Sequence, residues 1–252
     1  MHKYANPTEF MRIANVVLPW AAGVTVICFM VGLPLALIAS PADYQQGEAY
    51  RIMYIHVPSA WMGLMVYSIM AGGSAGFLIW RHPIAHLVAR ASAPLGAIFT
   101  ALCLVTGMLW GQPMWGTFWV WDARLTSMLM LFFLYLGYLA LGEAFEDPER
   151  GDKAAAVLAL VGTVNLPIIH FSVEWWNTLH QPSIFTMKGM TISADMIWPL
   201  FAMVFAFMGY YVCILVLRLR SEILNAKIRN ARSARAAQPM SATTTAATQG
   251  AP

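Results

Sequence analysis

Eight consecutive residues, from Trp115 to Asp122, hold the side chains with the clearest potential for binding chemistry. The segment reads WGTFWVWD, so three tryptophans and an aspartate lie between two long apolar runs. Indole rings beside a polar anchor suit a flat, amphiphilic, aromatic ligand at a membrane surface. Spacings of four and two residues do not align these indoles along one helical face, so we expect a shaped loop. A belt at the membrane boundary is the usual reason for such tryptophans, and it suits Trp20, Trp80 and Trp198 better.

Two of the six histidines, His56 and His180, are candidates for binding a metal ion. Neutral imidazole is a common metal ligand, and two imidazoles approaching from opposite sides could be the axial ligands of a haem iron. Each histidine alone has a simpler explanation. His56 could be a residue at the start of a helix, before Pro58, and His180 a polar loop residue. The metal-binding hypothesis therefore requires that the fold bring both to one face, beside the tryptophan-rich segment.

The composition indicates an integral membrane protein. Of the 252 residues, 59% are hydrophobic and only 11% are charged, whereas soluble domains average about 25% charged residues. Apolar runs of about 20 residues are long enough to cross a bilayer as helices. We predict an all-α fold with six transmembrane helices, at roughly residues 16–40, 57–80, 91–111, 126–143, 154–173 and 196–217.

Basic residues are distributed unevenly over the loops that six spans create. The termini and the even loops share one side of the membrane, and the odd loops, roughly 41–56, 112–125 and 174–195, share the other. The first side holds twelve of the fifteen basic residues: Lys3, Arg12, Arg81, Arg90, Arg150, Lys153, Arg218, Arg220, Lys227, Arg229, Arg232 and Arg235. The other side holds Arg51, Arg124 and Lys188. Because cytoplasmic loops carry the excess of Lys and Arg, we predict cytoplasmic termini and outward-facing odd loops.

This topology places the two candidate histidines and the tryptophan-rich segment on the outward face. His56 falls at the end of the first outward loop and His180 in the third, with the segment in the loop between them. A helical bundle brings such loop ends together. We therefore hypothesise a three-part haem site at this face. His170 falls inside the fifth span, where we expect a satisfied interior histidine near Asn165.

Charged residues of the outward loops offer supporting roles. Glu174 could orient an imidazole, or it could simply anchor the membrane boundary. Arg124 could pair with a haem propionate, since arginine matches carboxylates well, but a local ion pair with Asp122 competes with that role.

Cysteine usage and the motifs narrow the function by exclusion. Cys28, Cys103 and Cys213 all lie in predicted spans, without a Cys-x-x-Cys spacing. This pattern argues against disulfide exchange, a thiolate metal site and covalent attachment of haem to this chain. We find no nucleotide-binding signature and no hydrolase triad in the outward loops. We expect a binding protein and not an enzyme, with any use of ATP coming from a partner.

The chain is expected to have two parts. Residues 1–220 form the six-helix membrane domain that carries the site. Residues 221–252 are basic and then rich in Ser, Thr, Ala and Gln, a composition that favours a disordered cytoplasmic tail lying on anionic headgroups.

The outward loops also carry specific sequence motifs. These are WGTFWVWDARLT at 115–126, PADYQQG at 41–47, YIHVP at 54–58 and SVEWWNTLHQ at 172–181. Together they resemble the haem-handling family with a tryptophan-rich "WWD" signature, and within it the haem exporter protein C (CcmC) branch of the cytochrome c maturation system. The resemblance covers roughly residues 10–220. Phe118 lies where some members have another tryptophan, so an indole N–H donor is missing there.

The resemblance implies that the chain holds haem b, non-covalently and transiently, at the periplasmic face of a bacterial inner membrane. It further implies delivery of the haem to the chaperone CcmE during c-type cytochrome biogenesis. The implied partners are the ABC transporter subunits CcmA and CcmB and the small membrane protein CcmD, without nucleic acid. The implied axial ligands are His56 and His180, and the implied platform is Trp115, Trp119, Trp121 and Asp122.

Two other hypotheses stay open from the sequence. One is a quinone-linked redox protein or a cytochrome b-like subunit. Such a protein needs paired histidines within its spans, where only His170 is available. The other is a structural subunit whose aromatic loops bind partner proteins, in which case the purified chain would take up no haem.

Overall fold

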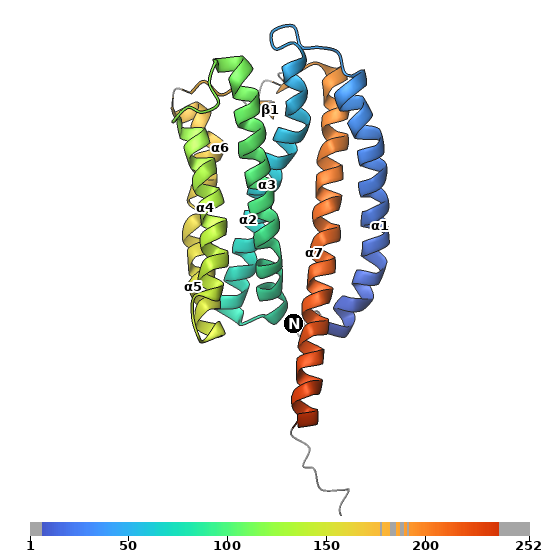
Figure 1. Ribbon diagram of the computed structural model, residues 1–252, viewed down its shortest axis with the longest axis vertical. Helices are drawn as coiled ribbons and strands as arrows, with labels where there is room; N and C mark the ends of the chain where they lie inside the picture. Colours follow the sequence, from blue (N-terminus) through green and yellow to red (C-terminus); the bar gives the residue numbers. More distant parts are fainter. Residues whose placement is uncertain (1–6, 177, 182–184, 187–188, 191, 237–252) are drawn as a thin grey trace, which may run out of the picture.

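The long apolar runs form helices that stand side by side in an elongated bundle (Figure 1). The computed structural model describes residues 7–176, 178–181, 185–186, 189–190 and 192–236. Within this part of the chain, six helical segments are long and apolar enough to cross a membrane: Thr8–Ala39, Glu48–Trp80, Pro83–Trp115, Ala123–Glu143, Pro148–Trp175 and Ala194–Asn225. The predicted all-α fold and its six spans are confirmed. Each span is longer than predicted, because polar residues beyond the apolar run continue the helix.

The first three spans contain the elements that frame the loops predicted to face outward, which keep the name outward loops below. Helix α1 (Pro7–Pro34) continues into a π-helical turn, η2 (Leu35–Ala39). A 3₁₀ turn, η3 (Glu48–Ile52), leads directly into α2 (Met53–Trp80), and α3 (Pro83–Trp115) follows. The second span, predicted to begin at roughly residue 57, begins earlier, because α2 already starts at Met53. As a result, His56 lies on α2 and not in the preceding loop.

The remaining spans carry the other two sides of the site. Helix α4 (Ala123–Glu143) is followed by α5 (Pro148–Gly162) and α6 (Asn165–Trp175), which together make one span. The interruption lies beside Pro167, which has no N–H for the Thr163 carbonyl. Two-residue strands β1 (Phe185–Thr186) and β2 (Gly189–Met190) form a small antiparallel hairpin before α7 (Ala194–Ala236).

The helices pack in a simple order. Helices α2 and α3 form the central pair, α4 packs on α3, α5 and α6, and α1 packs on α7. Figure 1 shows α1 and α7 together on one side of the bundle and α4, α5 and α6 on the other. The start of α1 and the end of α7 lie at the same end, as six spans require. The loops with the candidate site residues lie at the opposite end.

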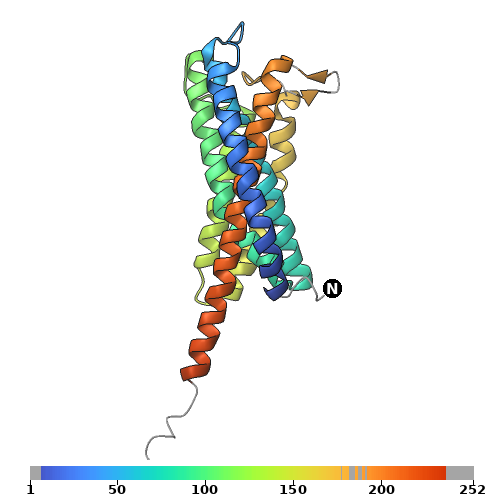
Figure 2. The same cartoon turned by 90° about the vertical axis from the view of Figure 1, so that its right-hand side faces the viewer.

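Helix α7 runs past residue 221, where we expected the disordered tail to begin. It continues to Ala236 and projects beyond the rest of the bundle (Figure 2). Neither Gly nor Pro interrupts residues 218–236, so nothing in the backbone chemistry ends the helix there. Residues 237–252 of the predicted tail lie outside the described residues.

Two tyrosines form the centre of the core between the helices. Tyr67 and Tyr135 are fully buried and meet edge to face, with ring centroids 5.1 Å apart. The Tyr135 hydroxyl donates a hydrogen bond to the Gly63 carbonyl over 2.7 Å. Gly96 makes room for this ring, because a Cβ at position 96 would lie 2.1 Å from Tyr135 Cζ.

We predict that Gly96→Ala destabilises the bundle by overpacking. The added methyl group must displace the buried Tyr135 ring, which costs about 1–3 kcal/mol. The thermal unfolding temperature in detergent should fall by several degrees. Gly72→Ala is the matched control, since a Cβ there meets nothing within 4 Å. Equal unfolding temperatures for the two variants would contradict the prediction.

Candidate functional site

A cavity of about 650 Å³ lies at the end of the bundle that carries the outward loops. Its walls come from the first outward loop, α2, α3, the loop before α4, α6 and the segment leading into α7. Four of the six predicted site residues line it: His56, Trp115, Trp119 and His180. The volume lies within the usual range for small-molecule sites, roughly 300–1,000 Å³.

His56 is held in one orientation by the helix beside it. Its side chain lies on α2, and the residue is 9% exposed. Nδ1 lies 3.0 Å from the Cys103 carbonyl oxygen and 3.1 Å from Thr106 Oγ1. Because a carbonyl oxygen only accepts, Nδ1 carries the hydrogen and Nε2 keeps its lone pair. Gly107 leaves the ring its space, since a Cβ there would lie 3.0 Å from His56 Cε1.

His180 is held in the same tautomer from the third outward loop. Its Nδ1 lies 3.0 Å from the Gln181 carbonyl oxygen, so Nδ1–H donates and Nε2 keeps the lone pair. Burial holds the pKa of His180 below its usual value, and the nearby Arg124 charge lowers that pKa further, against the hydrogen bond to Gln181, which raises it. This lowered pKa favours the neutral imidazole, the form that binds a metal.

The two imidazole rings face a shared space. Their centroids are 6.3 Å apart, with 33° between the ring planes. With a metal–nitrogen bond of about 2 Å and a ring radius of roughly 1.1 Å, two imidazoles on opposite sides of one metal ion would have centroids about 6 Å apart. The observed centroid separation is close to this value. Among the described residues there is no cluster of three His, Cys, Asp or Glu side chains that could hold a metal.

The tryptophan-rich segment forms one wall of the cavity. Helix α3 ends at Trp115 because Gly116 adopts a left-handed conformation (φ 74°), and the chain is not helical again until Ala123. The ring centroids of Trp115 and His180 are 6.3 Å apart. Trp119 also lines the cavity, and its indole N–H is buried without a hydrogen-bond partner in the described part of the chain.

Trp121 and Asp122 are not among the described residues that line the cavity. Trp121 is 76% exposed and packs edge to face on Trp119, with ring centroids 5.3 Å apart. Asp122 caps α4, where its Oδ1 accepts from the Leu125 N–H over 2.7 Å. Direct contact of these two residues with a ligand stays a prediction. In the structure, their neighbours are other residues of the site.

Asp122 also connects two of the outward loops. Its Oδ2 accepts a hydrogen bond from the Thr178 hydroxyl, and Thr178 Oγ1 accepts the His180 N–H over 3.0 Å. The tryptophan-rich loop thus holds the loop that carries His180. Thr178 was not among the residues predicted for the site. Its only signal was a hydroxyl residue two positions before the histidine, a spacing typical of a turn.

The first outward loop covers the cavity from another side. Asp43 accepts the N–H groups of Gln45 and Gln46 in a tight turn, each over 2.9 Å. The Gln46 side chain reaches α3, where Trp110 Nε1 donates to Gln46 Oε1 over 2.9 Å. Trp110 in turn meets the His56 ring edge to face. This loop therefore packs against one of the two imidazoles through Trp110.

His170 differs from expectation. We expected an interior histidine near Asn165, but His170 is exposed and lines the cavity. Asn165 is buried and donates instead to the Ser127 carbonyl over 2.9 Å. Glu174 lies one turn further along α6 and, within the described part of the chain, forms no hydrogen bond or ion pair with His56 or His180.

Comparisons with known proteins agree with the resemblance seen in the motifs. A family model described as Heme exporter protein C matches residues 1–234. The Heme exporter protein C of Bradyrhizobium diazoefficiens is 52% identical over 227 residues, covering 90% of this chain and 86% of that protein. The proteins of the same name from Haemophilus influenzae and Escherichia coli K12 are 49% and 46% identical. They cover 89% of this chain and 92% and 91% of their own lengths.

We predict that Thr178→Val loosens the loop that carries His180. Valine keeps the shape of threonine but removes the hydroxyl that joins Asp122 to the His180 N–H. Losing these hydrogen bonds should raise amide hydrogen exchange at His180 about tenfold, measured by mass spectrometry on the full chain. Thr178→Ser keeps the hydroxyl and should exchange like the wild type. If valine and serine give the same exchange rate, the connection does not hold the loop.

Proposed function

Because the chain belongs to the Heme exporter protein C family, we propose that it binds haem between His56 and His180 and presents it at the outward face of the membrane. The family implies a role in haem export for cytochrome c maturation. The chain is a membrane component of that process and not an enzyme. Haem is the cargo in this proposal.

The observation that carries the proposal is the pair of imidazoles. Both have Nδ1 bound to a backbone carbonyl, which leaves Nε2 as the nitrogen able to bind iron. Their centroid separation of 6.3 Å suits axial ligands. A porphyrin brings its own four equatorial nitrogens, which suits a site with only two protein ligands. Bound haem would supply an iron whose two axial positions are both taken, so that oxygen has no open site to react at.

The haem would be haem b, held without a covalent bond. Cys28, Cys103 and Cys213 are all free thiols, and none belongs to a haem-attachment motif. Trp115 and Trp119 line the same cavity as the two histidines and would pack on the porphyrin. Trp121 would support this platform through its contact with Trp119, and Asp122 through its hydrogen bond with Thr178. Non-covalent binding suits a protein that must later release its haem.

Delivery from this site requires that a partner reach the haem. Exposed aromatic side chains surround the cavity on the outward loops, among them Tyr44, Phe118 and Trp121. Such a surface suits protein contact. We propose that the haem chaperone CcmE docks here, on the periplasmic side of a bacterial inner membrane. The distribution of basic residues supports this orientation. CcmA, CcmB and CcmD, implied by the family resemblance, would complete the complex.

We predict that His56→Ala and His180→Ala each abolish the absorption spectrum of bis-histidine haem in the detergent-purified, haem-loaded protein. Each variant lacks one axial ligand, so the iron becomes five-coordinate or the haem is lost. His170→Ala is the matched control, because His170 lines the same cavity but has no role in the proposed ligation. The absorption spectrum of that variant should match the wild type.

Two outcomes would contradict the proposal. A wild-type protein that takes up no haem on titration would favour a structural subunit. A bis-histidine spectrum that survives in both single variants would show that other residues bind the iron.

A further inference from the structure

Building on the haem-binding function proposed above, we propose that the two histidines have different roles when the haem leaves. His56 keeps its bond to the iron, whereas His180 leaves first and frees one axial position for a donor atom of the receiving protein. The exchange needs no redox step. The bond from iron to His180 Nε2 breaks, the neutral imidazole takes its lone pair, and a lone pair of the incoming donor occupies the position. Nδ1 of His180 already carries its hydrogen, so the departing ring needs no proton.

His56 is held by two packed helices. It lies in the first turn of α2, which begins at Met53, and its Nδ1 faces two acceptors on α3, the Cys103 carbonyl and Thr106 Oγ1. The Thr106 hydroxyl donates to the Leu102 carbonyl over 2.7 Å, so its oxygen can accept from His56. Moving His56 away from the iron would mean separating α2 from α3, the central pair of the bundle.

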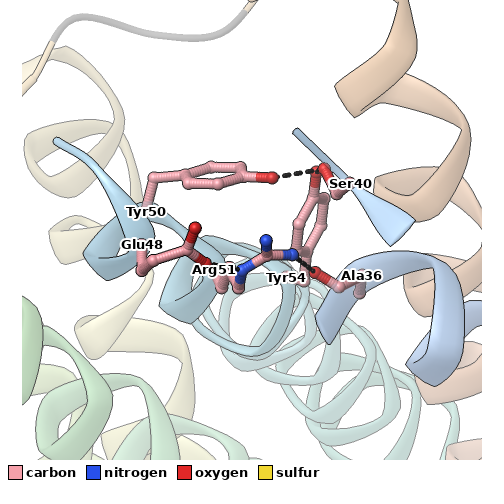
Figure 3. Close-up of polar contacts among 6 residues, drawn as sticks. All are labelled: Ala36, Ser40, Glu48, Tyr50, Arg51 and Tyr54. Atoms are coloured by element: carbon pink, nitrogen blue, oxygen red, sulfur yellow. Dashed lines mark hydrogen bonds and ion pairs between the residues drawn. The ribbon is translucent and has the colours of Figure 1, made fainter. Parts of the chain in front are cut away.

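The start of α2 is also attached to the end of α1. Figure 3 shows Tyr50 and Tyr54 directed toward Ser40, which follows η2. The Tyr50 hydroxyl donates to Ser40 Oγ, and Ser40 Oγ is hydrogen-bonded to the Tyr54 hydroxyl over 2.6 Å. All three residues are buried. Beside them, Arg51 Nη1 donates to the Ala36 carbonyl over 3.2 Å. The segment of α2 that carries the first histidine is therefore fixed by both α1 and α3.

His180 lies on a loop and not on a helix. The acceptor of its Nδ1–H is the carbonyl of Gln181, the next residue, so this acceptor moves together with the histidine. The hydrogen bond orients the ring but does not attach it to the bundle. His180 is also half-buried where His56 is buried, and its neighbour Leu179 is 56% exposed. A receiving protein at the outward face can therefore reach this side of the site.

The loop of His180 is attached to the rest of the outward face through Thr178. In the described part of the chain, the side-chain hydrogen bond that joins residues 178–181 to another loop is the one from the Thr178 hydroxyl to Asp122. Thr178 Oγ1 accepts the His180 N–H over 3.0 Å, so the two residues move as a unit. Segments with few packing contacts open at a lower free energy than packed helices. His180 should therefore dissociate from the iron faster than His56.

Cyanide binding to the ferric, haem-loaded full chain in detergent tests this order. Cyanide is a strong ligand of ferric haem, but with both axial positions taken it binds only after a histidine has left. At saturating cyanide, the rate seen by stopped-flow absorption equals the dissociation rate of the faster histidine. Thr178→Val should raise this limiting rate about tenfold, because it removes the hydrogen bond that holds the His180 loop. Thr178→Ser keeps the hydroxyl and should match the wild type.

Thr106→Val is the matched variant for the other histidine. It removes the hydroxyl that accepts from His56 and should change the limiting rate by less than about twofold, because His56 is not the ligand that leaves. The proposal is overturned by an unchanged rate in Thr178→Val. It is overturned equally by a Thr106→Val variant that is accelerated as much as Thr178→Val or more.

The single histidine variants decide the question if Thr178→Val does not fold. Haem titrated into His180→Gly should still bind through His56, with a dissociation constant about tenfold above that of the wild type. In His56→Gly the remaining ligand is on the loop, and the dissociation constant should rise about a hundredfold or more. Equal increases in the two variants, or a larger increase in His180→Gly, would contradict the proposed order.

Failure of this proposal is separable from failure of the proposed function. A wild type without a bis-histidine spectrum before cyanide is added overturns haem binding between the two histidines. A wild type with that spectrum, whose limiting rate responds to Thr106→Val and not to Thr178→Val, overturns only the order in which the histidines leave.

Discussion

The site depends on two hydrogen bonds from imidazole Nδ1 to backbone carbonyls. One joins His56 on α2 to Cys103 on α3, and the other joins His180 to the neighbouring Gln181. Each fixes the tautomer and the rotation of its ring, so that the lone pair stays on Nε2. The close packing of α2 on α3 brings His56 within reach of the Cys103 carbonyl. Gly107 permits that closeness, because any side chain there would meet the His56 ring.

Other residues of the outward loops hold these two imidazole rings in place through direct and indirect contacts. The three outward loops are not independent, since side-chain hydrogen bonds connect them to each other and to the helices. Gln46 ties the first loop to Trp110 of α3, and Asp122 ties the second loop to Thr178 of the third. Arg124 then connects α4 to the last turns of α6. These connections hold loop residues that are far apart in the sequence around one cavity, at one end of the helical bundle.

Several features of this arrangement could be predicted from single residues and their spacing. Long apolar runs determine six spans, because a buried backbone in a membrane must be helical. Loop parity then puts His56, the tryptophan-rich segment and His180 at one end of the bundle. Other features could not be predicted. The second span begins at Met53 and not at residue 57, so that His56 lies on α2, and His170 is exposed and lines the cavity instead of lying in the interior near Asn165. The first of these depends on where a helix begins, which apolar periodicity specifies poorly.

By itself the sequence determined the class of protein, the number of spans and the set of aromatic and imidazole side chains at one end. Those properties follow from hydropathy and from the period of a helix, which are local. Only the tertiary structure decided what each side chain does there. In the structure Trp115 and Trp119 line the cavity, whereas Trp121 and Asp122 are not among the described residues that line it. The tertiary structure also left Arg124 without the carboxylate partner that its neighbour in sequence suggested. Such roles depend on contacts between residues far apart in the chain, for which spacing along the sequence carries no information.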